Sequence, residues 1–184
     1  MIQNSKSPAF YQTSWPLKAL QLSVMLFIGA ATANAASAAE NTNAIPPAVM
    51  ALLQKQPPCP ETGLSIRITV KNVKSSRGII TADLHGDNPA DFLKEIVGRG
   101  RAVAVKGDTH ICIPVKKPGI YAIALYHDRN SNLQLDKNFL GIPSEPIGIS
   151  NNPKFGFSAP TFKESAFKVT DQGADLVIVL RNAL

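Results

Sequence analysis

Hydrophobic and polar residues alternate over short stretches of this chain, and the alternation predicts β-strands. In LSIRITVK, residues 64–71, every second side chain is apolar. Such alternation is typical of a strand with one face in a core and the other in water. GIYAIALYH, residues 119–127, has the same pattern after a Pro-Gly turn. One predicted face of this second strand carries Tyr121, Ile123 and Leu125, and the other carries Ala122, Ala124 and Tyr126.

Further stretches of β-branched and aromatic residues bring the predicted strands to about seven. These stretches are residues 79–85, 101–107, 109–116, 164–170 and 174–181. No long helix is predicted between them, so the pattern favours an all-β, antiparallel sandwich of the immunoglobulin-like or prealbumin-like kind with one long ordered loop. The last stretch contains LVIVL, which is apolar on both faces and therefore predicts a strand buried inside a sheet.

Two shorter segments show weaker patterns. In NPADFLKEIVGRG, Asp91 is expected to cap a short helix or turn that ends at Gly98 and Gly100. Residues 40–60 contain two Pro pairs and are expected to form an N-terminal linker with a turn of helix over 48–55.

The N-terminus has the pattern of an export signal over residues 1–39. Lys6 and Lys18 precede an apolar run, and small residues suited to cleavage after Ala38 or Ala39 follow it. A membrane anchor is the alternative, but the run is short for a spanning helix. The sequence therefore predicts a periplasmic or secreted protein, with no stable membrane span once the signal is removed, and a single sandwich domain over residues 61–184.

Charge excludes one class of partner. The formal net charge of +6 falls to +4 when Lys6 and Lys18 leave with the signal. The remaining basic residues are scattered, without the basic clusters and interleaved aromatics that bind nucleic acid, so none is expected as a partner.

The chain has two cysteines, Cys59 and Cys112. An even pair in an exported protein predicts a disulfide, which here would tie the segment before the first strand to the strand at 109–116. A redox or metal pair is the alternative, but it lacks the close spacing of such sites.

Residues 128 to about 158 show no clear periodicity, yet they carry enough apolar side chains to pack as an ordered loop. Short polar side chains recur at the spacing of a calcium loop, and Ca²⁺ is the candidate cofactor. The predicted ligands are Asp128, Asn130, Asn132, Gln134 through its carbonyl, Asp136 and, from farther along, Glu145. The alternative is a series of Asx-turns in which the same side chains bond their own backbone.

Two positions differ from an EF-hand. Leu133 occupies the place of the turn glycine, and Phe139 occupies the place of the bidentate glutamate. The pattern thus fits only a looser calcium loop of the kind found in extracellular modules.

A catalytic alternative uses His127 as a base with Asp128 and Glu145 as orienting acids, in a small hydrolase or metal-assisted enzyme. A zinc site formed by His127 with His85 and His110 is disfavoured, because no two of these ligands are close in sequence.

The chain from Leu64 to Leu180 resembles the exported bacterial proteins grouped as domain of unknown function 2141, most characteristically over residues 118–169. The matching positions are Gly119, Tyr121, Ala122, His127, Asp128, Asn130, Asn132, Asp136, Gly141, Pro143, Glu145, Gly148, Ser150, Asn151, Pro160 and Phe162. Leu133 departs from the pattern, since Gly is common there. The Pro-Gly-x-Tyr entry is similar to transthyretin-like and carboxypeptidase regulatory-like sandwiches. The resemblance implies an exported sandwich and no established activity.

Three functions remain open at this point. A non-enzymatic binding module for a protein or carbohydrate of the cell envelope is favoured, because loops at one end of such sandwiches present their contacts. The small hydrolase is the alternative, and a purely structural accessory domain is the third.

Overall fold

The computed structural model describes residues 44–60, 63–156 and 158–183, and in that part of the chain it contains eight strands and three short helices. The predicted signal, residues 1–39, lies outside the described residues. Among the described helices, none is long and apolar enough to cross a membrane.

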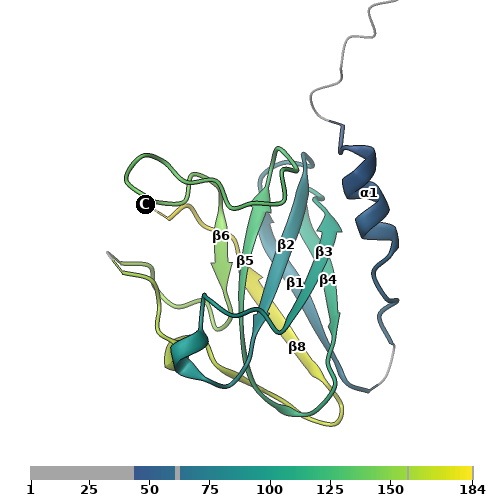
Figure 1. Cartoon of the computed structure of the whole chain (residues 1–184), viewed down its shortest axis with the longest axis vertical. Coiled ribbons are helices and arrows are strands. Elements are labelled where there is room, and N and C mark those ends of the chain that lie inside the picture. The colour runs from purple at the N-terminus through teal and green to yellow at the C-terminus, as the bar shows by residue number, and fades with distance from the viewer. Residues whose placement is uncertain (1–43, 61–62, 157, 184) are drawn as a thin grey trace, which may run out of the picture. The chain divides into compact units, whose positions relative to one another are not determined.

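The strands form two sheets, which confirms the predicted all-β sandwich (Figure 1). The smaller sheet contains, in order, β4 (Gly107–Pro114), β1 (Ser65–Val73) and β8 (Ala174–Val179). The larger sheet contains β3 (Gly98–Val103), β2 (Ile79–His85), β5 (Gly119–Asp128) and β6 (Ile147–Ile149), while β7 (Phe167–Val169) pairs with the start of β5. The resemblance to transthyretin-like sandwiches stays a prediction.

The core lies between the inner faces of the two sheets, and it is built by the alternation that predicted the strands. Ile66, Ile68 and Val70 of β1 are at most 1% exposed, and they belong to one apolar cluster with Ile123 and Leu125 of β5. The assignment of β5 side chains to two faces is therefore correct. Burial of each such side chain stabilises the fold by about 1.5–3 kcal/mol.

Two glycines allow the sheets to approach at their edges. A Cβ added to Gly100 of β3 would lie 2.7 Å from the Ile111 side chain and 2.8 Å from that of Ile113, both on β4. At the opposite edge, a Cβ on Gly148 of β6 would lie 2.8 Å from Ile178 of β8. Backbone hydrogen bonds of 2.8 and 2.9 Å between residues 147 and 181 join the sheets beside this second glycine.

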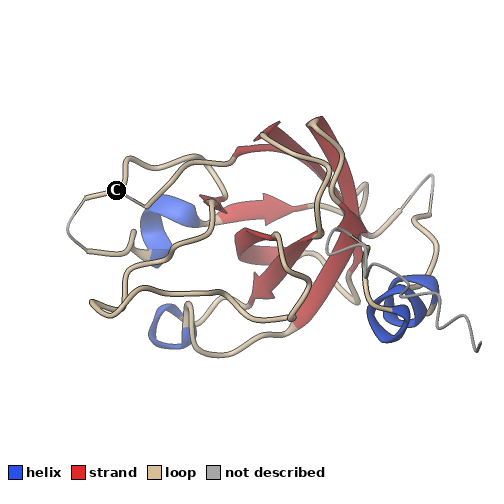
Figure 2. Cartoon of the chain, turned by 90° about the horizontal axis from the view of Figure 1, so that it is seen from above, coloured by secondary structure: helices blue, strands red, loops and turns tan. Residues whose placement is uncertain are grey.

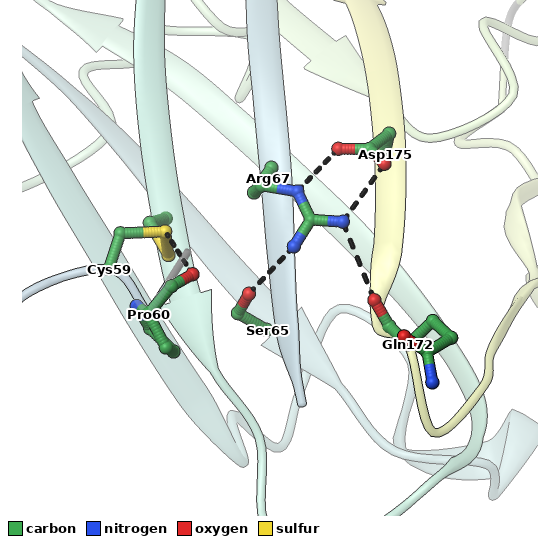
Figure 3. The surroundings of a disulfide bond; sticks show 7 residues. Cys59, Pro60, Ser65, Arg67, Gln172 and Asp175 are labelled. Atoms are coloured by element: carbon green, nitrogen blue, oxygen red, sulfur yellow. Dashed lines mark hydrogen bonds and ion pairs between the residues drawn. A yellow bond between two sulfur atoms is a disulfide. The ribbon is translucent and has the colours of Figure 1, made fainter. Parts of the chain in front are cut away.

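The segment before β1 is fastened to the domain at two points. Gln56, just after helix α1 (Pro47–Gln54), pairs its side-chain amide with both the N–H and the C=O of Arg101 on the edge strand β3. Cys59 then forms the predicted disulfide with Cys112 of β4, with Cα atoms 5.5 Å apart (Figure 3). The expected linker with a turn of helix is thus held against the β3 and β4 edges.

The prediction for the last strand is wrong in two respects. β8 lies at the edge of its sheet, with Val177 53% exposed, and it runs parallel to β1 instead of antiparallel. A side-chain contact also links the two strands: the Arg67 guanidinium donates two hydrogen bonds to the Asp175 carboxylate, at 2.6 and 2.9 Å (Figure 3). The LVIVL run is apolar on both faces, and this pattern alone did not distinguish an edge strand from a central one.

Two local predictions also need correction. The short helix η1 (Pro89–Asp91) is capped by Asn88, whose side chain accepts from the Ala90 N–H, so Asp91 is not the cap. Gly98 and Gly100 do not end this helix, because both lie within β3. In addition, β6 forms inside the stretch that showed no periodicity.

Candidate functional site

The outer face of the larger sheet, which points away from the core, has unusually small side chains at its centre. Because Ile123 and Leu125 point inward, Ala122 and Ala124 point outward. Asp83 and His85 on the neighbouring strand β2 pair with Ala124 and Ala122, respectively. Ala122 is buried in a cluster with Phe92, while Ala124 leaves space over β5 that a larger side chain would fill.

A cavity of about 600 Å³ lies over this face, and we call it the outer-face cavity. Its floor is formed by sheet residues: Asp83, His85, Ala124, Tyr126, Ile147 and Ile149. Its walls come from loops and are mainly apolar: Leu93, Ile96, Leu135, Leu140, Ile142, Pro143, Phe155 and Pro160. Figure 2 shows the long loops extending together to one side of the strands. A concave, largely apolar site of this size is typical of small-molecule binding.

The floor also contains polar groups with defined partners. Asp83 forms an ion pair with Arg99 of β3 directly across the strand pair. His85 is 2% exposed, and its Nδ1 lies 2.6 Å from the carbonyl oxygen of Glu95. Its Nε2 is buried and has no hydrogen-bond partner among the described residues.

Tyr126 fixes one wall to the floor. Its hydroxyl donates to the carbonyl oxygen of Leu133 at 3.2 Å, which ties the loop after β5 back to the strand. Burial raises the pKa of Tyr126, so the phenol stays neutral and available as a donor.

The loop between β5 and β6 is organised around a buried carboxylate. We call residues 128–145 the Asx loop. Asp128 is 0% exposed, and its two oxygens accept the backbone N–H groups of Asn132 and Leu133 at 3.1 and 2.8 Å. Oδ1 of Asn130 accepts from the Asn132 N–H at 3.1 Å, and Oδ1 of Asn132 accepts from the Gln134 N–H at 2.9 Å. These bonds form consecutive Asx-turns.

Glu145 closes the Asx loop from its far end. Its side chain is 2% exposed and accepts the N–H groups of Arg129 and Asp136 at 2.9 and 3.2 Å. Burial raises the pKa of Glu145, and the nearby charges of Asp128 and Asp136 add to this effect. The structure therefore brings Glu145 to the loop, as predicted, and uses it to bind backbone.

The predicted calcium ligands meet in this loop, but their polar atoms have other partners. The side-chain nitrogens of Asn130 and Asn132 donate to the two oxygens of Asp136 at 2.8 and 3.0 Å. A cation needs oxygens at these places. Within the described residues no group of three or more His, Cys, Asp or Glu side chains is arranged to hold a metal. The arrangement matches the Asx-turn alternative, and Ca²⁺ could enter only if both amides rotated, so calcium binding stays a prediction.

Leu133 shows why the turn departs from the usual pattern. Its φ is +65°, in the left-handed region that glycine adopts without strain. A tight turn thus forms at the position where calcium loops place glycine, although the residue is leucine.

The remaining motif residues have structural roles, and two of them, Gly141 and Pro143, line the cavity. Ser150 accepts from the Ile123 N–H at 2.9 Å and donates to the Ser165 carbonyl oxygen at 2.5 Å. The Asn151 amide donates to the carbonyl oxygen of Ala166 at 2.8 Å, which holds the segment before β7. Gly141 takes a positive φ of +78° at the tip of the loop. Pro143 pairs with Lys137 in an isolated antiparallel β-bridge. Gly148, the last of these motif residues, lies where β6 approaches β8 of the other sheet.

His127 is placed unfavourably for catalysis. Its side chain is 1% exposed, its Nε2 donates to the carbonyl oxygen of Arg77 at 2.7 Å, and it does not line the outer-face cavity. Burial lowers the pKa of His127, so the ring is neutral at neutral pH. His110 lies on the other sheet beside Thr69, away from the zinc grouping considered from the sequence.

Sequence reasoning missed the cavity and its floor residues Asp83 and Ala124, and it considered His85 only as a zinc ligand. One signal was present: Ala122 and Ala124 occupy consecutive outward positions of a strand whose inward positions are large. That pattern indicates that something other than β5 must cover the face.

Comparison with known proteins identifies the family. The sequence pattern of an uncharacterised protein conserved in bacteria, DUF2141, matches residues 68–176, more than half of the chain. The chain belongs to the DUF2141 family. The match includes β5, the Asx loop and most of the cavity of this DUF2141 protein, and no curated protein or solved structure matches it.

Proposed function

We propose that this DUF2141 protein is an exported, non-enzymatic binding module of the cell envelope whose ligand occupies the outer-face cavity. The observation that carries the proposal is the cavity itself, about 600 Å³ in volume, with an apolar wall and a few polar groups at its floor. Ordered loops hold the wall in place before any ligand arrives, which lowers the cost of binding.

The side chains that line the cavity favour one chemical class of ligand. Aliphatic side chains such as Leu135, Leu140 and Ile142 predominate, and they bury apolar groups more favourably than the many hydroxyls of a carbohydrate. The cavity therefore supports an apolar ligand, or an apolar part of a partner, over the carbohydrate expected as one option from the sequence.

Export is supported by the signal pattern of residues 1–39 and by the Cys59–Cys112 disulfide, a bond that persists in oxidising compartments. We expect protein recovered from the periplasm or medium to begin at residue 39 or 40. An uncleaved N-terminus on membrane-bound protein would instead support the anchor.

Filling the cavity tests the proposed site. Ala124→Phe places an aromatic ring on the floor, whereas Val105→Phe adds the same ring at a position that is 53% exposed and does not line the cavity. The fluorescent probe 1-anilinonaphthalene-8-sulfonate, whose aromatic rings bind apolar sites, should bind the wild type and Val105→Phe alike, and should bind Ala124→Phe at least about tenfold more weakly. Equal binding by both folded variants would place the site elsewhere.

A further inference from the structure

The floor of the outer-face cavity contains hydrogen-bond acceptors, one of which is the buried Nε2 of His85. The carbonyl oxygen of Glu95 can only accept, so the His85 Nδ1 that contacts it at 2.6 Å carries the proton. In the neutral ring Nε2 then holds a lone pair and no hydrogen. Any polar contact that His85 makes with a molecule in the cavity falls to this atom.

Asp83, two residues earlier on β2, adds a second acceptor. Arg99 donates to its Oδ1, and within the described residues no hydrogen bond reaches its Oδ2. The ion pair neutralises the charge of the Asp83 carboxylate and keeps it in position. The other polar floor residue, Tyr126, directs its hydroxyl to Leu133 and is not free to donate.

The acceptors therefore lack a matching donor on the floor itself. A buried acceptor without a partner is costly, and a ligand that supplies the missing hydrogen recovers part of that cost. Lys137 is the one charged donor in the lining, and it belongs to the loop wall.

We propose that the outer-face cavity selects small apolar molecules that carry a hydroxyl group, and that the hydroxyl donates to Nε2 of His85. This inference rests on the proposed function, because it names the ligand class of the same cavity. The aliphatic walls hold the apolar body of the ligand, and the floor acceptors orient its polar end.

A matched pair of probes and a matched pair of variants test the proposal. The probes are 2-naphthol and 2-methylnaphthalene, which have similar size and differ in the donor. His85→Asn keeps a side-chain N–H where Nδ1 donates and removes Nε2, and His110→Asn makes the same change on the other sheet. Dissociation constants come from ¹⁵N–¹H NMR titrations of the signal-free, disulfide-bonded protein.

The wild type and His110→Asn should bind 2-naphthol about three- to tenfold more tightly than 2-methylnaphthalene, the range expected for one net hydrogen bond. In His85→Asn this preference should disappear. If both probes shift cavity residues and the preference survives in His85→Asn, the ligand class is wrong while the binding site stands. If neither probe shifts cavity residues, the proposed function and this inference both fail.

A measurement on the wild type covers the case in which His85→Asn does not fold. The ¹⁵N resonance of His85 Nε2 should move on addition of 2-naphthol and stay in place with 2-methylnaphthalene. An unchanged Nε2 resonance at saturating 2-naphthol would overturn the proposal.

Discussion

Replacing Asp128 with asparagine should loosen the Asx loop and destabilise the whole domain. The wild-type carboxylate is fully buried and accepts two backbone N–H groups, from Asn132 and Leu133. The asparagine amide has one oxygen, so one of the two N–H groups faces an NH₂ group in place of an acceptor. The Asn132 N–H would keep its second acceptor, Oδ1 of Asn130. The change keeps the shape of the side chain and alters only its hydrogen bonding.

The magnitude follows from those two bonds. A hydrogen bond to a charged group contributes about 1.5–3 kcal/mol, and the new NH₂ group, which faces an N–H donor, adds to its loss. Removing the buried charge offsets part of this cost. We expect Asp128→Asn to lower the free energy of unfolding by about 2 kcal/mol, which is a large part of the stability of an ordinary domain.

Urea unfolding followed by far-UV circular dichroism measures the change. Fluorescence is less suitable, because the only tryptophan is Trp15, within the predicted signal. With a urea slope of about 1–2 kcal/mol per molar, the midpoint should fall by roughly 1–2 M. Asp136→Asn is the control, since its carboxylate binds only the side-chain amides of Asn130 and Asn132. A midpoint shift below about 0.3 M for Asp128→Asn, or an equal shift for the control, would refute this account of the loop.

Three further predictions concern other parts of the molecule. Gly100→Ala should lower the free energy of unfolding by about 1–3 kcal/mol, because its Cβ would approach two β4 side chains, whereas Gly156→Ala, with nothing within 4 Å, should not. A similar unfolding midpoint for both variants would contradict the proposed edge contact. The Arg67 guanidinium holds the pKa of Asp175 below its usual 3.8, so the stability that this pair contributes should be lost as the pH falls below that value. NMR titration should show the Asp175 midpoint rising toward 3.8 in Arg67→Gln, and an unchanged midpoint would show that the pair is not formed in solution. Finally, identical melting curves in EDTA and in excess calcium would remove Ca²⁺ as a ligand of the Asx loop, whereas a higher melting temperature in calcium would show that the folded protein binds it.

The strands that sequence predicted best are those whose two faces meet different surroundings. In LSIRITVK and GIYAIALYH the alternation reports a difference between core and surroundings, and β1 and β5 formed as expected. β6 was missed because a three-residue strand containing Gly148 is too short to show a period. The parallel pairing of β8 with β1 depends on the path of the whole chain, and the local pattern contains no information about it.

The candidate site shows the same limit. Asp128, Asn130 and Asn132 were correctly placed in one turn, since their spacing is a local property. Whether their oxygens bind metal or backbone depends on the positions of Leu133 and Glu145, which the fold decides. The outer-face cavity needs β2, β5 and three separate loops to meet, so no single stretch of sequence could reveal it.

The contact between Gln56 and the edge of β3 has a consequence for how copies of this protein can meet one another. An edge strand with free N–H and C=O groups is a template on which another chain can add. Here one glutamine side chain occupies both groups of Arg101 at the middle of the strand, and the nearby Cys59–Cys112 bond keeps that glutamine from drifting away. The residues that precede the sandwich therefore block this edge against the addition of a strand from another copy of the chain.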